Sequence, residues 1–194
     1  MLNDKLNDKK IILASASPRR QQFLKEMNIN FSIKIKNIEE VYPKNLKSEE
    51  ITNYLAKLKA NAFEKDLKKN EILITADTIV WHKNKPLEKP QDKKSAIRML
   101  LSLSGKTHKV ITSVCIKSQK KEIIFNDVTK VTFAKINEDE INYYVSNYSV
   151  LDKAGSYGIQ DWIGLIGIKK IKGSYTNVVG LPTQLLYKNL IKFI

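Results

Sequence analysis

The chain has 194 residues, of which 42% are hydrophobic and 28% are charged, and its formal net charge is +14. This composition is typical of one folded domain with a sizeable core, and it excludes an intrinsically disordered chain. The single cysteine, Cys115, cannot form an internal disulfide, and the two histidines, His82 and His108, lie too far apart to fit a zinc motif.

The positive charge comes mostly from lysines that are scattered along the whole chain. Arginine occurs at three positions, Arg19, Arg20 and Arg98. Surfaces that bind nucleic acid favour clustered arginine with interleaved aromatic residues, so nucleic acid is not expected as a partner. Because arginine is so scarce, the adjacent pair at positions 19 and 20 indicates a specific task. Bidentate binding of phosphate is a task that lysine performs poorly.

Two observations bear on the cellular compartment. No apolar run approaches the roughly 18–20 residues of a membrane helix. The apolar stretch Ile11–Ala16 follows two lysines, but it is shorter than the core of a signal peptide, which needs about 7–15 residues. A buried strand fits this stretch better, so we expect a cytoplasmic protein that does not contact a membrane.

The first third of the chain predicts two strands and two helices. Ile11–Ser15 is typical of a short buried strand, and the alternating pattern of Phe31–Lys36 indicates a second one. Between them, Pro18–Met27 is expected to be a helix, because Ser17 can cap it and proline suits the first helical position. Apolar residues at helical spacing predict the longest helix over Ser48–Leu67.

The rest of the chain predicts a similar mixture of elements. Ile72–Thr75 is an apolar strand that runs into Ala76-Asp77-Thr78, and Ile79–Trp81 continues it. The other expected elements are a helix from Asp92 to Leu103, a hairpin of Thr107–Ile116 and Glu122–Phe133 around the turn Ser118–Lys121, a helix over Asn137–Asn147, a strand over Ile163–Ile171, and a terminal helix opened by Pro182.

Together these elements predict an α/β fold in which helices flank a mixed β-sheet. The glycine fingerprint of a Rossmann domain does not occur in the sequence. The chain also has no internal repeat, low-complexity segment or Gly/Ser linker. We therefore expect a single domain over residues 11–194, preceded by an N-terminal extension over residues 1–10.

The first candidate site lies where the first strand ends and the first helix begins. Ser15-Ala16-Ser17-Pro18-Arg19-Arg20 brings two hydroxyl and two guanidinium groups next to the free backbone N–H groups of a helix start. The helix dipole favours an anion there, and a polyphosphate needs several fixed donors of this kind. The alternative interpretation is a capped surface helix with exposed arginines.

Carboxylates supply the second candidate site. Asp77 follows an apolar strand, where an acidic residue is costly unless it is paired or bound to a metal. It could hold Mg²⁺, activate a water, or do both, although an exposed aspartate in a turn is an equally good interpretation of these residues alone. Glu39 and Glu40 follow a predicted strand, and a second carboxylate near Asp77 would complete a site for a hard cation.

Two further segments contain candidate residues for binding a ligand. Lys89 precedes Pro90, which stiffens the chain around the lysine. Leu151–Gln160 contains two of the seven glycines, which permit close approach of the backbone to a ligand. Gln160 at its end offers both a donor and an acceptor, as recognition of a base edge requires.

Taken in order along the chain, these motifs resemble the Maf family of nucleoside triphosphate pyrophosphatases. The resemblance runs from Ile11 to about Leu190, and it rests on the set rather than on any single motif. The motifs are Ser-Ala-Ser-Pro-Arg-Arg at 15–20, Glu-Glu at 39–40, Leu-Ala-Lys-Leu-Lys-Ala at 55–60, Ala-Asp-Thr at 76–78, Lys-Pro at 89–90, Leu-Ser-Gly-Lys-Thr-His at 103–108, Asp-Lys-Ala-Gly-Ser-Tyr-Gly-Ile-Gln at 152–160 and Val-Gly-Leu-Pro at 179–182.

The resemblance implies a mixed α/β fold with two lobes around a cleft, similar to inosine triphosphate pyrophosphatases and often forming a homodimer. It implies hydrolysis of a nucleoside triphosphate to the monophosphate and pyrophosphate, with Mg²⁺ or another divalent cation such as Mn²⁺. Within the family, the chain is most similar to the branch that acts on dTTP and UTP. That likeness rests on Arg19 after Pro18, Thr78 after Asp77, and Gln160.

By the same resemblance, Asp77 is the general base and a metal ligand, and Glu40 is its partner carboxylate. Thr78 and Gln160 are expected to select the base. The full set expected to bind the substrate is Ser15, Ser17, Arg19, Arg20, Lys59, Thr78, Lys89, Asp152, Lys153 and Gln160. The sequence departs from the family's pattern after Gln160, where the family often has glycine and this chain has Asp161-Trp162.

Two alternatives remain open on the sequence. One is a regulator of cell division that acts through a protein partner or nucleic acid, and the excess of lysine is its only support in the sequence. The other keeps the same chemistry but takes modified nucleotides as substrates.

Overall fold

The computed structural model describes residues 2–6 and 8–194, and the chain divides into two compact units. Unit 1 contains the chain up to Asp77 together with Thr112–Asp127 and Gly180–Ile194. Unit 2 contains Thr78–Ile111 and Val128–Val179. Three long strands supply residues to both units: β3 (Glu71–His82), β5 (Thr107–Lys117) and β6 (Glu122–Phe133).

Over the described residues the strands form a seven-stranded sheet in the order β2-β1-β3-β5-β6-β7, with β4 paired to β3. β1 (Lys10–Leu13) is parallel to both β2 (Phe31–Ile33) and β3. β4 (Lys85–Leu87) is antiparallel to β3, and β7 (Ile168–Lys172) is antiparallel to β6. The sheet is therefore mixed, as predicted.

The predicted hairpin is confirmed by β5 and β6, which are neighbours in the sheet. In its turn the Ser118 N–H donates to the Lys121 carbonyl at 2.8 Å. At the other end of the pair, the hydroxyl groups of Thr107 and Thr132 lie 2.8 Å apart. These contacts fix one register along both strands, and so they fix which side chains face each side of the sheet.

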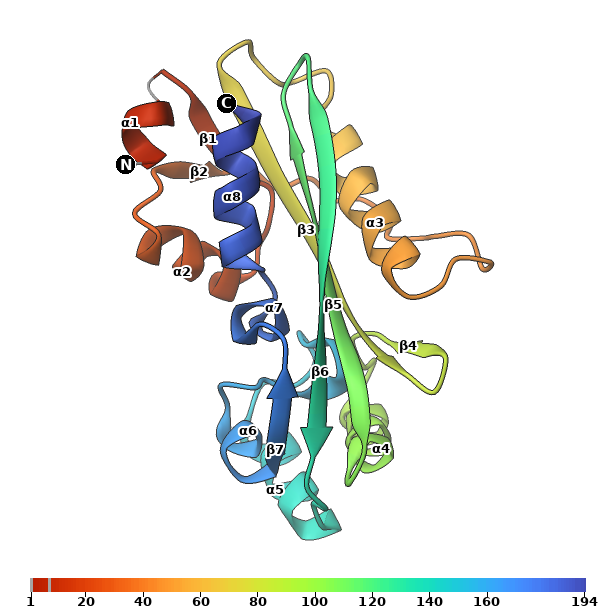
Figure 1. Cartoon of the computed structure of the whole chain (residues 1–194). Helices are drawn as coiled ribbons and strands as arrows, with labels where there is room; N and C mark the ends of the chain where they lie inside the picture. Colours follow the sequence, from red (N-terminus) through yellow and green to blue (C-terminus); the bar gives the residue numbers. More distant parts are fainter. Residues whose placement is uncertain (1, 7) are drawn as a thin grey trace. The chain divides into compact units, whose positions relative to one another are not determined.

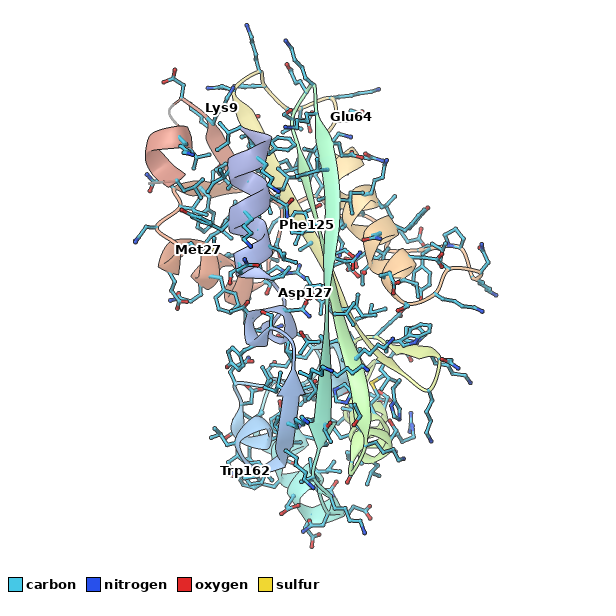
Figure 2. The ribbon with its side chains drawn as sticks, viewed as in Figure 1. Lys9, Met27, Glu64, Phe125, Asp127 and Trp162 are labelled. Carbon is cyan, nitrogen blue, oxygen red and sulfur yellow. The ribbon has the colours of Figure 1, made fainter. Side chains whose placement is uncertain are left out.

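Unit 1 has helices on both faces of its part of the sheet (Figure 1). α3 (Glu49–Asn61) covers one face, where Ile12 and Leu73 pack with Ala56 and Ala60. The other face packs against three helices, α1 (Leu2–Leu6), α2 (Pro18–Glu26) and α8 (Thr183–Phe193). Met27 and Phe125, labelled in Figure 2, are among the partly buried side chains on this second core.

Unit 2 packs its helices on the remaining parts of β3, β5 and β6 together with β4 and β7 (Figure 1). Its core includes Leu100, Phe133, Ile141, Tyr144 and Ile163, all almost fully buried. The helical segments that contribute to it are α4 (Lys93–Leu103), α5 (Glu138–Asn147), the 3₁₀ turn η1 (Ala154–Ser156), α6 (Trp162–Gly167) and α7 (Tyr175–Val179).

Two helices of unit 2 begin where the sequence predicted. Asp92 caps α4 by accepting from the Ser95 N–H, and the Ser95 hydroxyl accepts from the Asp92 N–H in return. Asn137 and Glu140 form the same reciprocal pair at the start of α5. Such capping boxes satisfy backbone donors that a helix start otherwise leaves free, so the sequence alone locates these starts well.

The predicted strand over Ile163–Ile171 is wrong in its first half. Trp162–Gly167 is the helix α6, and the strand β7 begins only at Ile168. The helix starts because the Gly164 and Leu165 N–H groups donate to the Asp161 carbonyl. A continuous apolar run has no period that separates a buried strand from a short helix, which is why the sequence misled here.

Three other elements differ in detail from the prediction. The helix expected over Ser48–Leu67 ends at Asn61, and the strand expected over Phe31–Lys36 ends at Ile33. Ser17 occupies the N-cap position of α2, but its side chain makes no capping hydrogen bond. Its backbone N–H instead donates to Ser15 Oγ at 3.3 Å, so the turn before the helix is held from within.

Residues 1 and 7 of the predicted N-terminal extension lie outside the described residues. Within the extension, Leu2–Leu6 form α1, and Leu2 and Leu6 are each 5% exposed in the core beside α8. In the part of the chain that the structure describes, no helix is both long and apolar enough to cross a membrane.

Candidate active site

Asp77 lies inside unit 1, and the interpretation as an exposed turn residue is wrong. The residue is 6% exposed and sits within β3, which continues to His82. Because side chains alternate along a strand, Asp77 shares a face with Leu73 and Thr75. That face lies under α3, where the Thr75 hydroxyl donates to the Ala56 carbonyl at 2.7 Å.

Lys59 on α3 joins the two predicted carboxylates. Its Nζ lies 2.7 Å from Asp77 Oδ1 and 2.9 Å from Glu40 Oε2. The structure therefore brings Glu40, from the loop after β2, to the same ammonium group as Asp77. The Lys59 side chain is only 15% exposed, so this pairing acts in a partly desolvated setting where opposite charges interact more strongly than in water.

The second carboxylate oxygen of Asp77 is left without a partner. Asp77 Oδ2 is buried and accepts no hydrogen bond from the described residues. Leaving a buried charged oxygen unsatisfied costs on the order of 1–3 kcal/mol or more. A ligand that satisfied this oxygen would recover that free energy. Among the described residues, no three His, Cys, Asp or Glu side chains are grouped to hold a metal ion.

Arg20 fastens the turn Ser15–Arg20 to β3 beside Asp77. Its Nη1 donates to the Ala76 carbonyl at 2.9 Å and to Ser15 Oγ at 3.3 Å. Its Nε donates to the Gly180 carbonyl at 2.8 Å. Two guanidinium nitrogens therefore bind the backbone. The motif alone did not indicate this role, because carbonyl acceptors leave no trace in a sequence pattern.

Positive charge is concentrated at the start of α2. Burial lowers the pKa of Arg20, and the nearby carboxylate of Asp77 opposes that shift. The first turn of α2 contains Arg19 and Arg20 and no acidic residue, whereas α3 begins with two glutamates. The helix dipole favours negative charge at this position, so the start of α2 has an excess of positive charge that an anion would offset.

The other predicted site residues belong to unit 2. Lys89 and Gln160 are exposed, and Thr78 is half-buried. Gly155 has a φ of +69°, and a Cβ there would lie 2.7 Å from Val80 Cγ2. This glycine therefore allows close packing of its loop on β3.

Lys153 is buried in a cluster that the sequence did not predict. Its Nζ donates to the Ser149 carbonyl, lies 3.1 Å from Asp152 Oδ1, and lies 3.7 Å from Asp161 Oδ2. The same oxygen of Asp161 accepts from the Tyr144 hydroxyl at 2.6 Å. Tyr144 lies in the helix expected over Asn137–Asn147, and nothing in the sequence marked it as a site residue. The departure from the family's pattern at position 161 was the available signal for the carboxylate.

Among solved structures, the fold is similar to that of the Ham1 protein of Staphylococcus aureus. The TM-score is 0.58 at 16% sequence identity, and the match covers 96% of this chain and 100% of that chain. At this identity the similarity concerns the fold alone. It confirms the predicted class, an α/β protein with helices flanking a mixed sheet.

The sequence comparisons narrow this class to a family. The family model for Maf-like protein matches residues 10–193. The chain is 58% identical over 191 residues to the dTTP/UTP pyrophosphatase of Flavobacterium psychrophilum, with 98% of each chain covered. It is 50% identical over 182 residues to the dTTP/UTP pyrophosphatase of Bacteroides fragilis, with 93% of this chain and 94% of that one covered. The chain belongs to the Maf family.

Proposed function

We propose that this protein is a nucleoside triphosphate pyrophosphatase that hydrolyses dTTP and UTP to the monophosphate and pyrophosphate. The observation that carries the proposal is the buried, unpartnered Oδ2 of Asp77 next to a turn that Arg20 ties to the same strand. Relatives that match nearly the whole chain are named for this activity, which supports the choice of substrate.

Mg²⁺ fits the donors that are present. Asp77 Oδ2 is a buried anionic oxygen without a partner, and Glu40 shares Lys59 with the same residue. Mg²⁺ is usually held by one or two carboxylates together with phosphate oxygens of the substrate, so Asp77 and Glu40 would hold it, and Mn²⁺ would suit the same donors. When bound, the ion would neutralise phosphate charge and lower the pKa of a water.

Asp77 acts as the general base in this proposal. Lys59 holds Oδ1 and thereby orients the carboxylate, which accepts the proton of the attacking water. The water oxygen bonds to the α-phosphorus while the bond from that phosphorus to the α–β bridging oxygen breaks, and pyrophosphate leaves. Such catalysis depends on positioning and on electrostatic stabilisation of the developing charge.

The start of α2 binds the triphosphate. Arg19 and the hydroxyl groups of Ser15 and Ser17 supply donors around the helix N-terminus, and the bound anion offsets the positive excess there. Arg20 keeps the turn in place through its bonds to the Ala76 and Gly180 carbonyls. Lys89, which is exposed, supplies a further positive charge for phosphate.

Thr78 and Gln160 select the base, and Asp152 lies in the same segment as Gln160. Gln160 is exposed and offers both a donor and an acceptor, which suits the donor–acceptor edge of thymine or uracil.

We expect the protein to act on the cytoplasmic nucleotide pool and to form a homodimer. Size-exclusion chromatography with light scattering would detect the dimer.

The alternative of a nucleic-acid-binding regulator has weaker support. Several lysines bind carboxylates of the same chain: Lys34 pairs with Glu71 and Lys57 with Glu122. Part of the positive charge is therefore neutralised locally. Steeply salt-dependent binding to random duplex DNA is the result that would favour this alternative.

A panel of nucleoside triphosphates tests the proposal directly. The panel contains dTTP, UTP, CTP, dATP, GTP and modified pyrimidine nucleotides, with pyrophosphate and phosphate release measured separately. We expect pyrophosphate without phosphate, the fastest turnover with dTTP and UTP, and loss of turnover when a chelator removes divalent cations. Release of phosphate alone, or equal rates on every base, would contradict the proposal. Preference for the modified nucleotides would favour the alternative in which they are the substrates.

A further inference from the structure

The segment that contains Gln160 ends in a tight turn. The Asp161 N–H donates to the Gly158 carbonyl at 3.0 Å, which closes a turn with Ile159 and Gln160 in the middle. Ile159 is 6% exposed and packs in the core of unit 2, whereas Gln160 is exposed. The turn therefore buries one central side chain and presents the other to solvent.

One hydroxyl group bonds to both ends of this turn. The Tyr144 hydroxyl donates to Asp161 Oδ2 at 2.6 Å, and its oxygen accepts from the Gly158 N–H at 3.0 Å. Tyr144 is fully buried on α5, and its ring stacks on Tyr148, so core packing fixes the hydroxyl in space. Burial and the hydrogen bond with Asp161 raise the pKa of the phenol, which keeps it a neutral donor.

Lys153 supplies the opposite charge for Asp161. Its Nζ lies 3.7 Å from Asp161 Oδ2, and its side chain is 9% exposed. The other partners of this ammonium are Asp152 Oδ1 and the Ser149 carbonyl. An ammonium group with these partners braces the loop.

Gly158 leaves the room that the arrangement needs. A Cβ at position 158 would lie 2.5 Å from Asp161 Oδ2. A side chain at 158 would therefore push the carboxylate away from the tyrosine hydroxyl. Asp161 stands where the family often has glycine, and it can reach the tyrosine hydroxyl only because position 158 is a glycine.

We propose that Tyr144, Asp161 and Lys153 form a clamp that fixes the orientation of Gln160 and thereby sets the base preference of the enzyme. The inference rests on the proposed function, because it takes Gln160 to select the base. The three clamp residues are positioning residues that act through Gln160. In this assignment Lys153 braces the loop, in place of the phosphate-binding role that the motif suggested.

A double-mutant cycle tests the clamp. Tyr144→Phe keeps the ring and removes the hydroxyl, and it is compared with Gln160→Ala and with the double variant by steady-state kinetics on dTTP, UTP and CTP. We expect Tyr144→Phe to raise KM for dTTP about tenfold with kcat within about twofold, and the double variant to match Gln160→Ala alone. Losses that multiply in the double variant would overturn the clamp and indicate general destabilisation.

Tyr148→Phe is the matched control. It removes the hydroxyl of the ring that stacks on Tyr144 and leaves the Tyr144 hydroxyl in place, so its KM values should equal those of the wild type. If Tyr144→Phe fails to fold, Asp161→Asn serves instead. It keeps an acceptor for the tyrosine but removes the charge that Lys153 compensates, so a smaller rise in KM, about threefold, is expected.

Hydrogen exchange separates failure of the clamp from failure of the proposed function. Exchange of the Gly158 amide should be slow in the wild type and at least about tenfold faster in Tyr144→Phe, whatever the enzyme hydrolyses. A wild-type protein without activity on any nucleotide would overturn the proposed function, and exchange would still report on the clamp. Unchanged exchange at Gly158, or wild-type kinetics in Gln160→Ala, would overturn the clamp.

Discussion

Each unit of the molecule holds a lysine between two carboxylates, and the two clusters differ in which polar atoms they leave without a hydrogen-bond partner. In unit 1, Lys59 binds Asp77 Oδ1 and Glu40, while Asp77 Oδ2 has no partner among the described residues. In unit 2, Lys153 binds two aspartates and a carbonyl, and the contacting oxygen of Asp161 also accepts from a tyrosine. The first cluster is therefore suited to binding a ligand, and the second to holding its loop in place. The family resemblance alone assigned phosphate binding to both lysines.

Replacing the unsatisfied carboxylate should give the largest effect. Asp77→Asn is expected to lower kcat by about 10³-fold, because the amide cannot accept the proton of the attacking water. The amide occupies the same volume, so nucleotide binding and the melting temperature should largely persist. Pyrophosphate release and nucleotide titration on the purified variant measure the two effects.

Asp66→Asn is the control for that experiment. Asp66 is an exposed carboxylate of unit 1 that pairs with Lys36, so its loss should leave turnover unchanged. Near-wild-type turnover in the Asp77 variant would remove that residue from the role of general base.

Replacing the two lysines in turn sharpens the comparison. Lys59→Met should lower kcat/KM by about 10²-fold, because the Asp77 carboxylate, which is the proposed general base, loses the ammonium group that orients it. Lys153→Met should lower it less than about tenfold and mainly through KM, and it should also lower stability, because the partly buried carboxylate of Asp161 loses its opposite charge. The exposed Lys69→Met serves as the control. Equal losses of kcat in both variants would mean that the two clusters have the same task.

Local signals explain how much of the fold the sequence predicts. The helices expected from Asp92 and from Asn137, and the polar turn between β5 and β6, are confirmed, and each is held by hydrogen bonds between residues close in sequence. The run Ile163–Ile171 lacked such a local signal, and its helical half was missed. Local hydrogen bonding is visible in sequence, whereas the choice between two buried conformations depends on tertiary packing.

The candidate site was predictable as a list of residues but not as an arrangement. The expected strand already continued past Asp77 to Trp81, but the sequence did not show that α3 covers the face of β3 on which the carboxylate lies. The family motif predicted that Arg20 binds phosphate. In the structure, Arg20 donates to the Ala76 and Gly180 carbonyls, which lie 56 and 160 residues away in the sequence. Partners at such separations are set by the fold, and side-chain patterns do not encode backbone acceptors.

Acid should weaken unit 2 before unit 1. Both histidines lie in unit 2, and burial, with a smaller contribution from His82, lowers the pKa of His108 to about 3. The unfolded chain therefore binds a proton below about pH 6.5 that the folded chain does not, so stability is lost as pH falls from about 6.5 towards 3, by about 2 kcal/mol at pH 5. In unit 1, a hydrogen bond from the Lys68 N–H lowers the pKa of Glu71, so its contribution is lost only below about pH 4.5.

Urea unfolding followed by tryptophan fluorescence measures this loss, because Trp81 and Trp162 both belong to unit 2. The midpoint should fall between pH 7.5 and pH 5 in the wild type and fall less in His108→Gln. An equal fall in both proteins would place the acid sensitivity elsewhere than His108.

The smallest expected effect concerns the single thiol, which lies in unit 1 and so complements the tryptophan signal of unit 2. Cys115 is fully buried between α3 and the sheet, and burial raises the pKa of its thiol to about 12. The thiolate is the reactive form, so iodoacetamide at pH 8 should label the folded protein at a negligible rate and the urea-unfolded protein within minutes.

Because labelling requires unit 1 to open, the labelling rate of Cys115 in Lys153→Met tests whether the two units unfold together. An unchanged rate in that variant, despite a lower fluorescence midpoint, would show that unit 1 keeps its core when unit 2 is weakened, whereas a rate raised in proportion would show one cooperative transition.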